Sequence, residues 1–289
     1  MKRKRHNPNG TTPDLTDLGL LRAVVSLPSS LVTSIFGWTK TGKSTLALSC
    51  PDPVVMFSFD LGDERAINPI LEKTSRDIYL DQITIPPKAK PEEWGRIFAE
   101  FKNTYDRVVV DPRVRYIIID TTTSSWKLVR LDAFDGKLEK QLARSYGPAN
   151  ADFSELISLA KVNDKNLILV SEAREEWVGG KTTGKIIRNA PSVVGYACDL
   201  ELQTRRSEAG IYSAKVCEAG RRPGLIGEKF GAGEGREHEL TLPWLMAESV
   251  PLTSPAHWGD DDLEETWQEE LAEVEEAPAP RRRKRKVTT

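Results

Sequence analysis

The segment Gly37–Thr45 reads "GWTKTGKST" and fits the pattern G-x-x-x-x-G-K-[ST] at every fixed position. An apolar run precedes it, and a run that favours a helix follows it. In this pattern glycines let backbone N–H groups turn towards phosphates, and the new helix points its N-terminus at the same charge. Lys43 is expected to reach the β- and γ-phosphates and the Ser44 hydroxyl to ligate Mg²⁺. The segment predicts a site for ATP and Mg²⁺.

The whole loop is expected to line the nucleotide site. Its members are Gly37, Trp38, Thr39, Lys40, Thr41, Gly42, Lys43, Ser44 and Thr45. Trp38 is unusual in such a loop. It could stack on a base, contact a neighbouring subunit or simply pack against the loop, and these alternatives stay open at this point.

Asp120 is the second expected metal-side group. It ends the run "VRYIIID", which reads as a buried strand whose carboxylate emerges beside the phosphates and holds Mg²⁺ directly or through water. The alternative is a core strand that ends in a helix-capping Asp. The upstream phosphate loop favours the metal-side interpretation.

The elements that must position these residues alternate along the chain. Short apolar runs and amphipathic stretches follow one another from Leu31 to about Ala247, which indicates βα units and an α/β fold with a mainly parallel, buried sheet flanked by helices. Two later runs alternate more and predict antiparallel strands at the sheet edge. Expected strands are "LVTSIF", "PVVMFSF", "ITI", "VRYIIID", "NLILVS", "CDLELQT" and "GIYSAKVCEAG"; expected helices are Lys43–Ser49, Ala66–Thr74, Pro91–Tyr105 and Ala149–Asn163.

Composition bounds the class of protein. The chain has 289 residues, a formal net charge of -2 and three cysteines far apart in sequence, which argues against a zinc site or a disulfide framework. No apolar run approaches the roughly 18 residues that span a bilayer. A cytoplasmic location without membrane contact is expected.

Three regions are expected. Residues 1–13 are basic and polar and are expected to be disordered; residues 14–250 form the ATPase domain; residues 251–289 form a flexible tail, acidic and then basic. Leu263, Trp267, Leu271 and Val274 recur at helical spacing and allow one marginal helix in that tail. Its basic end could contact phosphates, and the tail could recruit a single-strand-binding or replication partner or act as a solvated linker.

Thr121 follows Asp120, where helicases and AAA+ machines usually carry a glutamate. With "GWTKTGKSTLAL", "VVMFSFDLGDE", "YIIIDTTTSSW" and "LILVSEARE", the chain resembles the RecA-like core ATPases, and in particular phage-type proteins associated with single-strand annealing and recombination. The resemblance covers roughly Leu31 to Leu245. It implies a RecA-like P-loop fold, ATP hydrolysis, action on single-stranded DNA, and assembly into a homo-oligomeric ring or filament. If the gene is phage-borne, the expected location is the cytoplasm of a bacterial host cell.

The resemblance also implies a catalytic base after the strand "PVVMFSFD". Relatives tend to read Asp-x-Glu here, but this chain has Gly62 in the glutamate position. Asp63 and Glu64 follow, so the base is expected to be Glu64 or, second, Asp63, and a solvated acidic turn is the alternative. Slow or absent ATP hydrolysis is therefore also compatible with the sequence.

The resemblance implies further roles for residues at positions that match the family. Ser171 would sense the γ-phosphate, and Lys215, Arg221 and Arg222 are candidates for residues acting on a neighbour's nucleotide. The segment after Ser171 is a candidate DNA contact, with a routine exposed hairpin as its alternative. Candidate DNA-binding residues are Arg144, Arg174, Trp177, Lys181, Lys185 and Arg188.

The sequence therefore favours a Mg-dependent, DNA-linked ATPase with Lys43 and the base in catalysis. A non-hydrolysing nucleotide-dependent switch or scaffold is the first alternative. A P-loop small-molecule kinase is the second, and neither an arginine-rich lid nor an acceptor pocket is evident for it.

Overall fold

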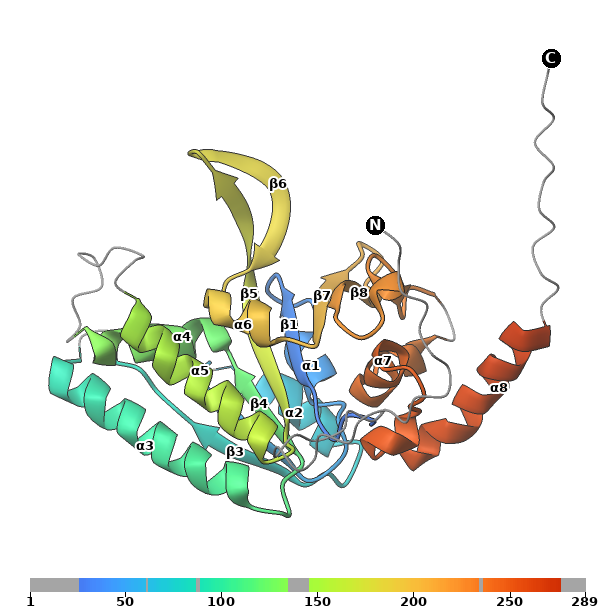
Figure 1. Cartoon of the computed structure of the whole chain (residues 1–289), viewed down its shortest axis with the longest axis horizontal. Helices are drawn as coiled ribbons and strands as arrows, with labels where there is room; N and C mark the ends of the chain where they lie inside the picture. The colour runs from blue at the N-terminus through green and yellow to red at the C-terminus, as the bar shows by residue number, and fades with distance from the viewer. Residues whose placement is uncertain (1–25, 61, 87–88, 135–145, 234–235, 277–289) are drawn as a thin grey trace, which may run out of the picture.

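A central sheet of nine strands organises the chain in the computed structural model, which describes residues 26–60, 62–86, 89–134, 146–233 and 236–276 (Figure 1). The strand order is β3-β2-β4-β5-β1-β7-β8-β9, with β6 paired to β5. The first six strands of this order are parallel, and β8 and β9 add to the edge in antiparallel fashion. The predicted α/β fold class, a mostly parallel sheet with flanking helices and antiparallel edge strands, is confirmed.

The strands are short and mostly apolar. Every residue of β1, β2 and β4 is buried, as expected for parallel strands covered on both faces. The bounds are β1 Val32–Gly37, β2 Val54–Ser58, β3 Ile78–Gln82, β4 Tyr116–Asp120, β5 Asn166–Val178, β6 Lys181–Arg188, β7 Leu200–Arg206, β8 Tyr212–Ala219 and β9 Lys229–Phe230.

Helices cover both faces of the sheet and divide the core into two layers. One face packs against α1 (Lys43–Ala47), α2 (Glu64–Leu71), α7 (Leu242–Ser249) and α8 (Glu264–Glu276). The other packs against α3 (Pro91–Val110), α4 (Thr122–Ala133), α5 (Gly147–Val162) and α6 (Ser192–Ala197). Four 3₁₀ turns complete the described chain: η4 Pro223–Leu225, η5 Glu237–Leu240, η6 Pro255–Trp258 and η7 Asp261–Leu263. Among the described residues, no helix has the length and apolarity needed to cross a bilayer.

The strand order brings the expected site residues together. β5 lies between β1 and β4, so Gly37 pairs in register with Glu172, and Asp120 with Val170. Because parallel strands end at the same edge of a sheet, the phosphate loop and the Asp120 carboxylate lie at one edge.

Some elements differ from the sequence prediction. The edge strand β3 is Ile78–Gln82. It starts five residues before the predicted strand "ITI" (83–85) and ends directly before it, because Val54–Ser58 pairs with Ile78–Gln82. α4 was not predicted, since "TTTSSW" has few strong helix formers. It starts there because Thr121 accepts a capping hydrogen bond from the backbone N–H of Ser124.

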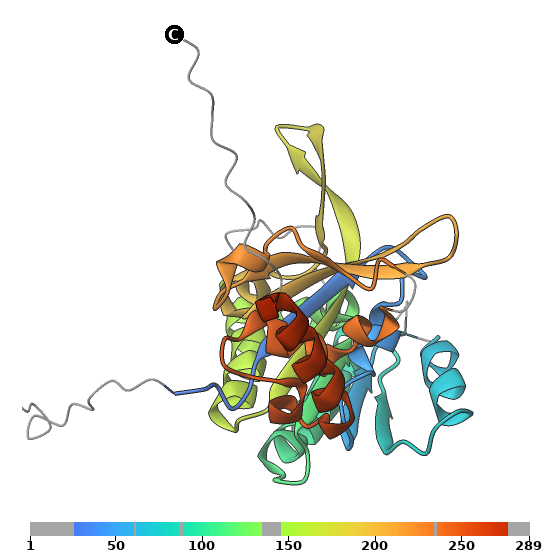
Figure 2. The same cartoon turned by 90° about the vertical axis from the view of Figure 1, so that its right-hand side faces the viewer.

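The β5/β6 hairpin projects from the body in both views (Figures 1 and 2). β5 has 13 residues, and its pairing with β6 begins where its pairing with β1 ends. The turn uses Gly179 and Gly180, whose φ angles of 59° and 78° favour glycine.

Residues 251–272 differ from the predicted flexible tail, because they pack on the core. Trp258 is fully buried and Trp267 is 6% exposed. Trp267 meets Trp244 edge-to-face with ring centroids 4.8 Å apart. Two buried tryptophans therefore anchor this acidic segment to the core. The basic end and the predicted disordered residues 1–13 lie outside the described residues.

Candidate functional site

The phosphate loop has a backbone that requires glycine at two positions. Gly42 has φ 86°, a left-handed conformation, directly before α1. A Cβ on Gly37 would lie 2.3 Å from the Thr204 hydroxyl oxygen, so no side chain fits there. Thr41 also bonds to Thr204 (2.8 Å between their hydroxyl oxygens), which ties the loop to β7.

Ser44 and Asp120 meet at the mouth of this loop. The Ser44 hydroxyl donates a 2.5 Å hydrogen bond to Asp120 Oδ2. Asp120 is 2% exposed, and burial raises the pKa of its carboxyl to about 6, although the Ser44 hydrogen bond and the Lys43 charge oppose the rise. The peptide bond between Asp120 and Thr121 is cis. A hydroxyl and a carboxylate in contact form an oxygen-donor pair of the kind that Mg²⁺ prefers.

The Lys43 ammonium lies inside the loop. Its Nζ donates a 2.9 Å hydrogen bond to the backbone carbonyl of Trp38, which also accepts a bond from the Thr41 hydroxyl. Burial lowers the pKa of Lys43, while the charges of Asp120, Glu172 and Asp60 oppose this. The ammonium is therefore held among acidic side chains at the carboxyl edge of the sheet.

Asp63 is buried beside this cluster of charges. Glu64, which the sequence favoured as the base, is exposed at the start of α2. Asp63 is 5% exposed, and its Oδ2 has no hydrogen-bond partner among the described residues. Burial, followed by the charges of Asp120 and Asp60, raises the pKa of Asp63 to about 7. A carboxyl with such a pKa can take up a proton near neutral pH.

Ser171 and Glu172 continue the site along β5. Ser171 is fully buried, and its hydroxyl has no hydrogen-bond partner within the described part of the chain. Glu172 was not predicted. It pairs in register with Gly37, and its carboxylate is close enough to oppose the lowering of the Lys43 pKa. The only sequence signal was its position directly after the expected sensor.

Tyr212 is a second residue that the sequence did not reveal. Its ring atom Cδ1 lies 3.0 Å from where a Cβ of Gly42 would be, so the ring packs against the phosphate loop. Arg206 stacks on the same ring, 5.3 Å from its centroid. Trp38, at the start of the loop, is half exposed.

Comparison with known proteins agrees with this geometry. The family model AAA_24, described as an AAA domain, matches residues 30–218. The chain belongs to the AAA_24 family. The expected P-loop ATPase is thereby confirmed at the level of the family, while the phage-type and annealing roles stay predictions.

A solved structure, the crystal structure of the RadB recombinase, is also similar to this AAA_24 chain. The TM-score is 0.42 with 16% sequence identity, over 73% of this chain and 90% of that one. No curated protein matches the sequence.

Three residues of this AAA_24 chain were expected to act on the nucleotide of a neighbouring subunit, and their surroundings differ. Lys215 lies half-buried on β8. Arg222 is ion-paired with Glu248 at 2.9 Å and also donates to the Glu248 backbone carbonyl. Arg221 is exposed, with no ion-pair partner among the described residues.

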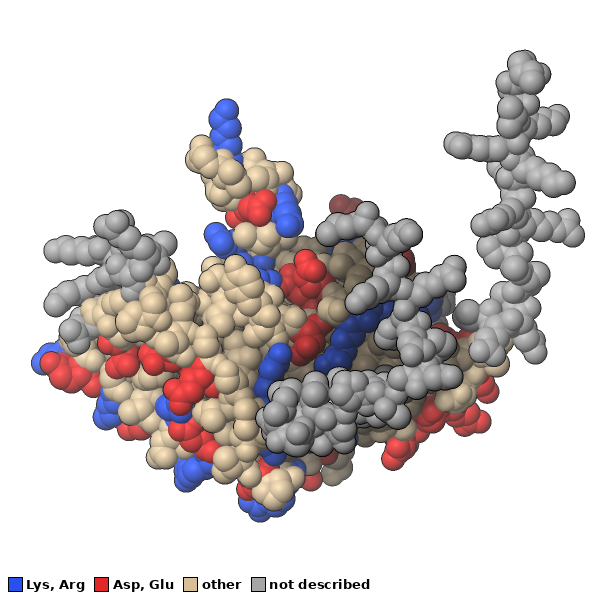
Figure 3. All heavy atoms as spheres, in the orientation of Figure 1, with Lys and Arg blue, Asp and Glu red and all other residues tan. Residues whose placement is uncertain are grey.

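The candidate DNA contacts gather on the hairpin. Trp177 is 61% exposed, and Arg174, Lys181 and Lys185 are exposed around it. Figure 3 shows cations on the projecting hairpin. Arg188 instead pairs with Glu201 at the hairpin base. Arg144 lies outside the described residues.

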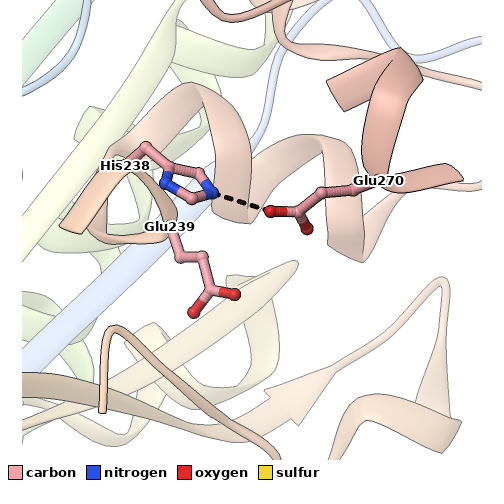
Figure 4. A group of neighbouring side chains, drawn as sticks. All are labelled: His238, Glu239 and Glu270. Carbon is pink, nitrogen blue, oxygen red and sulfur yellow. Dashed lines mark hydrogen bonds and ion pairs between the residues drawn. The ribbon is translucent and has the colours of Figure 1, made fainter. Parts of the chain in front are cut away.

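A separate group of His238, Glu239 and Glu270 joins α8 to the body (Figure 4). Their potential ligand atoms lie within 4.8 Å of one another. However, Glu239 already accepts a 2.8 Å bond from the Gly231 backbone N–H and pairs with Arg236, and His238 pairs with Glu270 at 2.9 Å. These internal contacts explain the group as an anchor of the helix.

Proposed function

We propose that this chain is a Mg-dependent ATPase of RecA-like type that acts on single-stranded DNA in recombination, annealing or repair. The observation that carries the nucleotide part is the Ser44–Asp120 hydrogen bond at the mouth of the glycine-requiring loop. DNA action rests on the exposed aromatic and cationic hairpin and on the resemblance to RecA-like ATPases.

The residues present fit ATP and Mg²⁺. Gly37 and Gly42 allow the backbone to approach phosphates closely, and Lys43 supplies the cation that the β- and γ-phosphates require. Ser44 and Asp120 would hold Mg²⁺. When bound, the nucleotide supplies the phosphoanhydride whose cleavage provides the free energy.

Asp63 is our preferred base for activating the attacking water, ahead of Glu64. Its burial, its unpartnered Oδ2 and its raised pKa support this role, whereas Glu64 is exposed. The Ser171 hydroxyl, buried and unpartnered among the described residues, would report the γ-phosphate by hydrogen bonding to it.

Assembly into a homo-oligomer, as a ring or filament in the cytoplasm, belongs to the same proposal. Arg221 and Lys215 are the stronger candidates for action on a neighbour's nucleotide, because Arg222 is already paired with Glu248. The basic C-terminal cluster is proposed to contact DNA or a replication partner.

The test is a steady-state ATPase assay across a range of single-stranded DNA concentrations. We expect DNA to raise the rate, and we expect Trp177→Ala with Lys181→Ala to weaken that stimulation while leaving the DNA-free rate intact. A rate that stays constant at every DNA concentration would refute the DNA part of the proposal.

A non-hydrolysing switch is the second candidate. It is favoured by Gly62 at the position where relatives carry glutamate. ATP binding without measurable turnover, with or without DNA, would select it over the ATPase.

A further inference from the structure

A hollow of about 640 Å³ lies at the foot of the β5/β6 hairpin. Its walls come from the hairpin, from α6 and from the first residues of β7 with the last of β8. Figure 1 shows α6 between the hairpin and the body. The volume falls within the roughly 300–1,000 Å³ typical of pockets for small organic groups. None of the phosphate-loop residues Gly37–Thr45 lines it, although Phe36, the β1 residue directly before the loop, does.

The rim of the hollow combines an aromatic ring with cations. Tyr196, on α6, is 91% exposed, which is unusual for a large side chain inside a folded domain. Arg174 and Lys185 line the hairpin side, and neither has an ion-pair partner among the described residues. Exposed aromatic rings beside backbone-tracking cations are the usual means of holding a single nucleic-acid strand.

The side of the hollow formed by β7 and β8 carries negative charge. Glu201 forms an ion pair with Arg188 there, so the charge of Arg188 is neutralised. Glu218, which is exposed, adds a carboxylate that has no ion-pair partner among the described residues. A carboxylate repels a phosphate but can accept hydrogen bonds from the polar edge of a base. The charge distribution therefore favours phosphates beside the hairpin cations and the base beside the carboxylates of β7 and β8.

We propose that this hollow receives one nucleobase of a single-stranded DNA, with Tyr196 stacking on the base and Arg174 and Lys185 contacting the flanking phosphates. The inference rests on the proposed action on single-stranded DNA and adds a base-binding pocket to it. It also assigns a role to Tyr196, which no sequence motif marks.

The experiment compares two fluorescently labelled strands of equal length, oligothymidylate and an abasic strand, by anisotropy. The abasic strand keeps the phosphates and lacks the bases. We expect wild-type protein to bind oligothymidylate more tightly, and Tyr196→Ala to weaken that binding by about 5- to 100-fold and remove the preference. Tyr79→Ala, an exposed tyrosine on the far edge strand, is the matched control and should keep it.

Lys185→Ala should weaken both strands alike and reduce the salt dependence, because it removes a phosphate contact only. Thermal melts would verify that each variant folds. A Tyr196→Ala protein that keeps the wild-type preference for oligothymidylate would overturn the base pocket alone, whether or not the mass of its oligomer changes. A wild-type protein that binds neither strand would overturn the proposed DNA action as well.

Discussion

The Ser44 hydroxyl and Asp120 Oδ2, 76 residues apart in sequence, lie 2.5 Å from each other. This contact joins the first turn of α1, which follows β1, to the end of β4, although β5 separates β1 from β4 in the sheet. The two oxygens are held by separate elements of the core, so their spacing does not depend on a mobile loop. The pair can therefore be tested as one metal-binding unit.

Removing either member of this pair should abolish Mg²⁺-dependent nucleotide binding. We expect Ser44→Ala and Asp120→Asn each to reduce ATP affinity at millimolar Mg²⁺, while little changes in EDTA, because only the metal contribution is lost. Isothermal titration with and without Mg²⁺ measures this. Equal losses in both buffers would show that the pair acts on folding or on phosphate directly.

Lys43→Ala should lower ATP affinity by at least about 100-fold, since a partly buried ammonium directed at phosphates is lost. Titration of a fluorescent ATP analogue gives the change. Lys73→Ala, an exposed lysine just after α2, is the control and should bind like wild type. Comparable affinities for the two variants would contradict the assignment of the loop.

Asp63→Asn should reduce the ATPase rate at least about 100-fold, and Glu64→Gln much less, because only Asp63 is buried in the charge cluster. Affinity for ATP should change little in both. Single-turnover kinetics would separate chemistry from binding. The reverse ranking would transfer the role of base to Glu64.

The same residue has a consequence for stability. Because burial raises its folded-state pKa to about 7, ionised Asp63 costs stability above that pH, and the cost disappears as pH falls towards its unfolded value. Asp63→Asn should therefore be more stable than wild type at pH 8, by about 4 kcal/mol, and nearly equal at pH 4. Urea unfolding at the two pH values measures the difference, and a pH-independent difference would argue against the buried carboxyl.

Gly37→Ala should destabilise the fold by about 1–3 kcal/mol, because its Cβ would lie 2.3 Å from the Thr204 hydroxyl. Gly62→Ala is the control, since its Cβ would meet only Arg65 at 3.8 Å. Thermal denaturation of both variants compares them. If the two melt alike, the close approach of β1 and β7 is not what requires glycine at position 37.

Trp267→Ala should cost about 3–5 kcal/mol, the usual loss for a buried tryptophan. Leu271→Ala, on the same helix but 46% exposed, should cost much less. Chemical denaturation distinguishes them. Small effects in both would restore the flexible tail that the sequence predicts.

Features that depend on a local sequence pattern could be predicted from the sequence, and features that depend on long-range packing could not. The phosphate loop and Asp120 were predictable, because glycine, lysine and serine at fixed spacing, and an apolar run ending in Asp, carry their meaning within a few residues. Trp267 was not, because its partner Trp244 lies on another helix and the acidic residues around it dominate the local composition.

The choice between Asp63 and Glu64 was also beyond the sequence. The two acids are adjacent, and only the direction of the chain entering α2 decides which one turns inwards. Glu172 and Tyr212 reach the loop through strand register and through the β7–β8 turn, neither of which leaves a motif.

β5 is a single strand that runs from the candidate nucleotide site to the projecting hairpin. Ser171 and Glu172 end its stretch beside the nucleotide loop, and Trp177 lies six residues after Ser171 on the same strand, about 20 Å further along at the usual rise. The intervening chain has one irregularity in its pairing, between Glu175 and Trp177, and no loop. Because no loop interrupts β5 between these residues, a small tilt of the strand at Ser171 would displace the hairpin tip further than it displaces Ser171 itself.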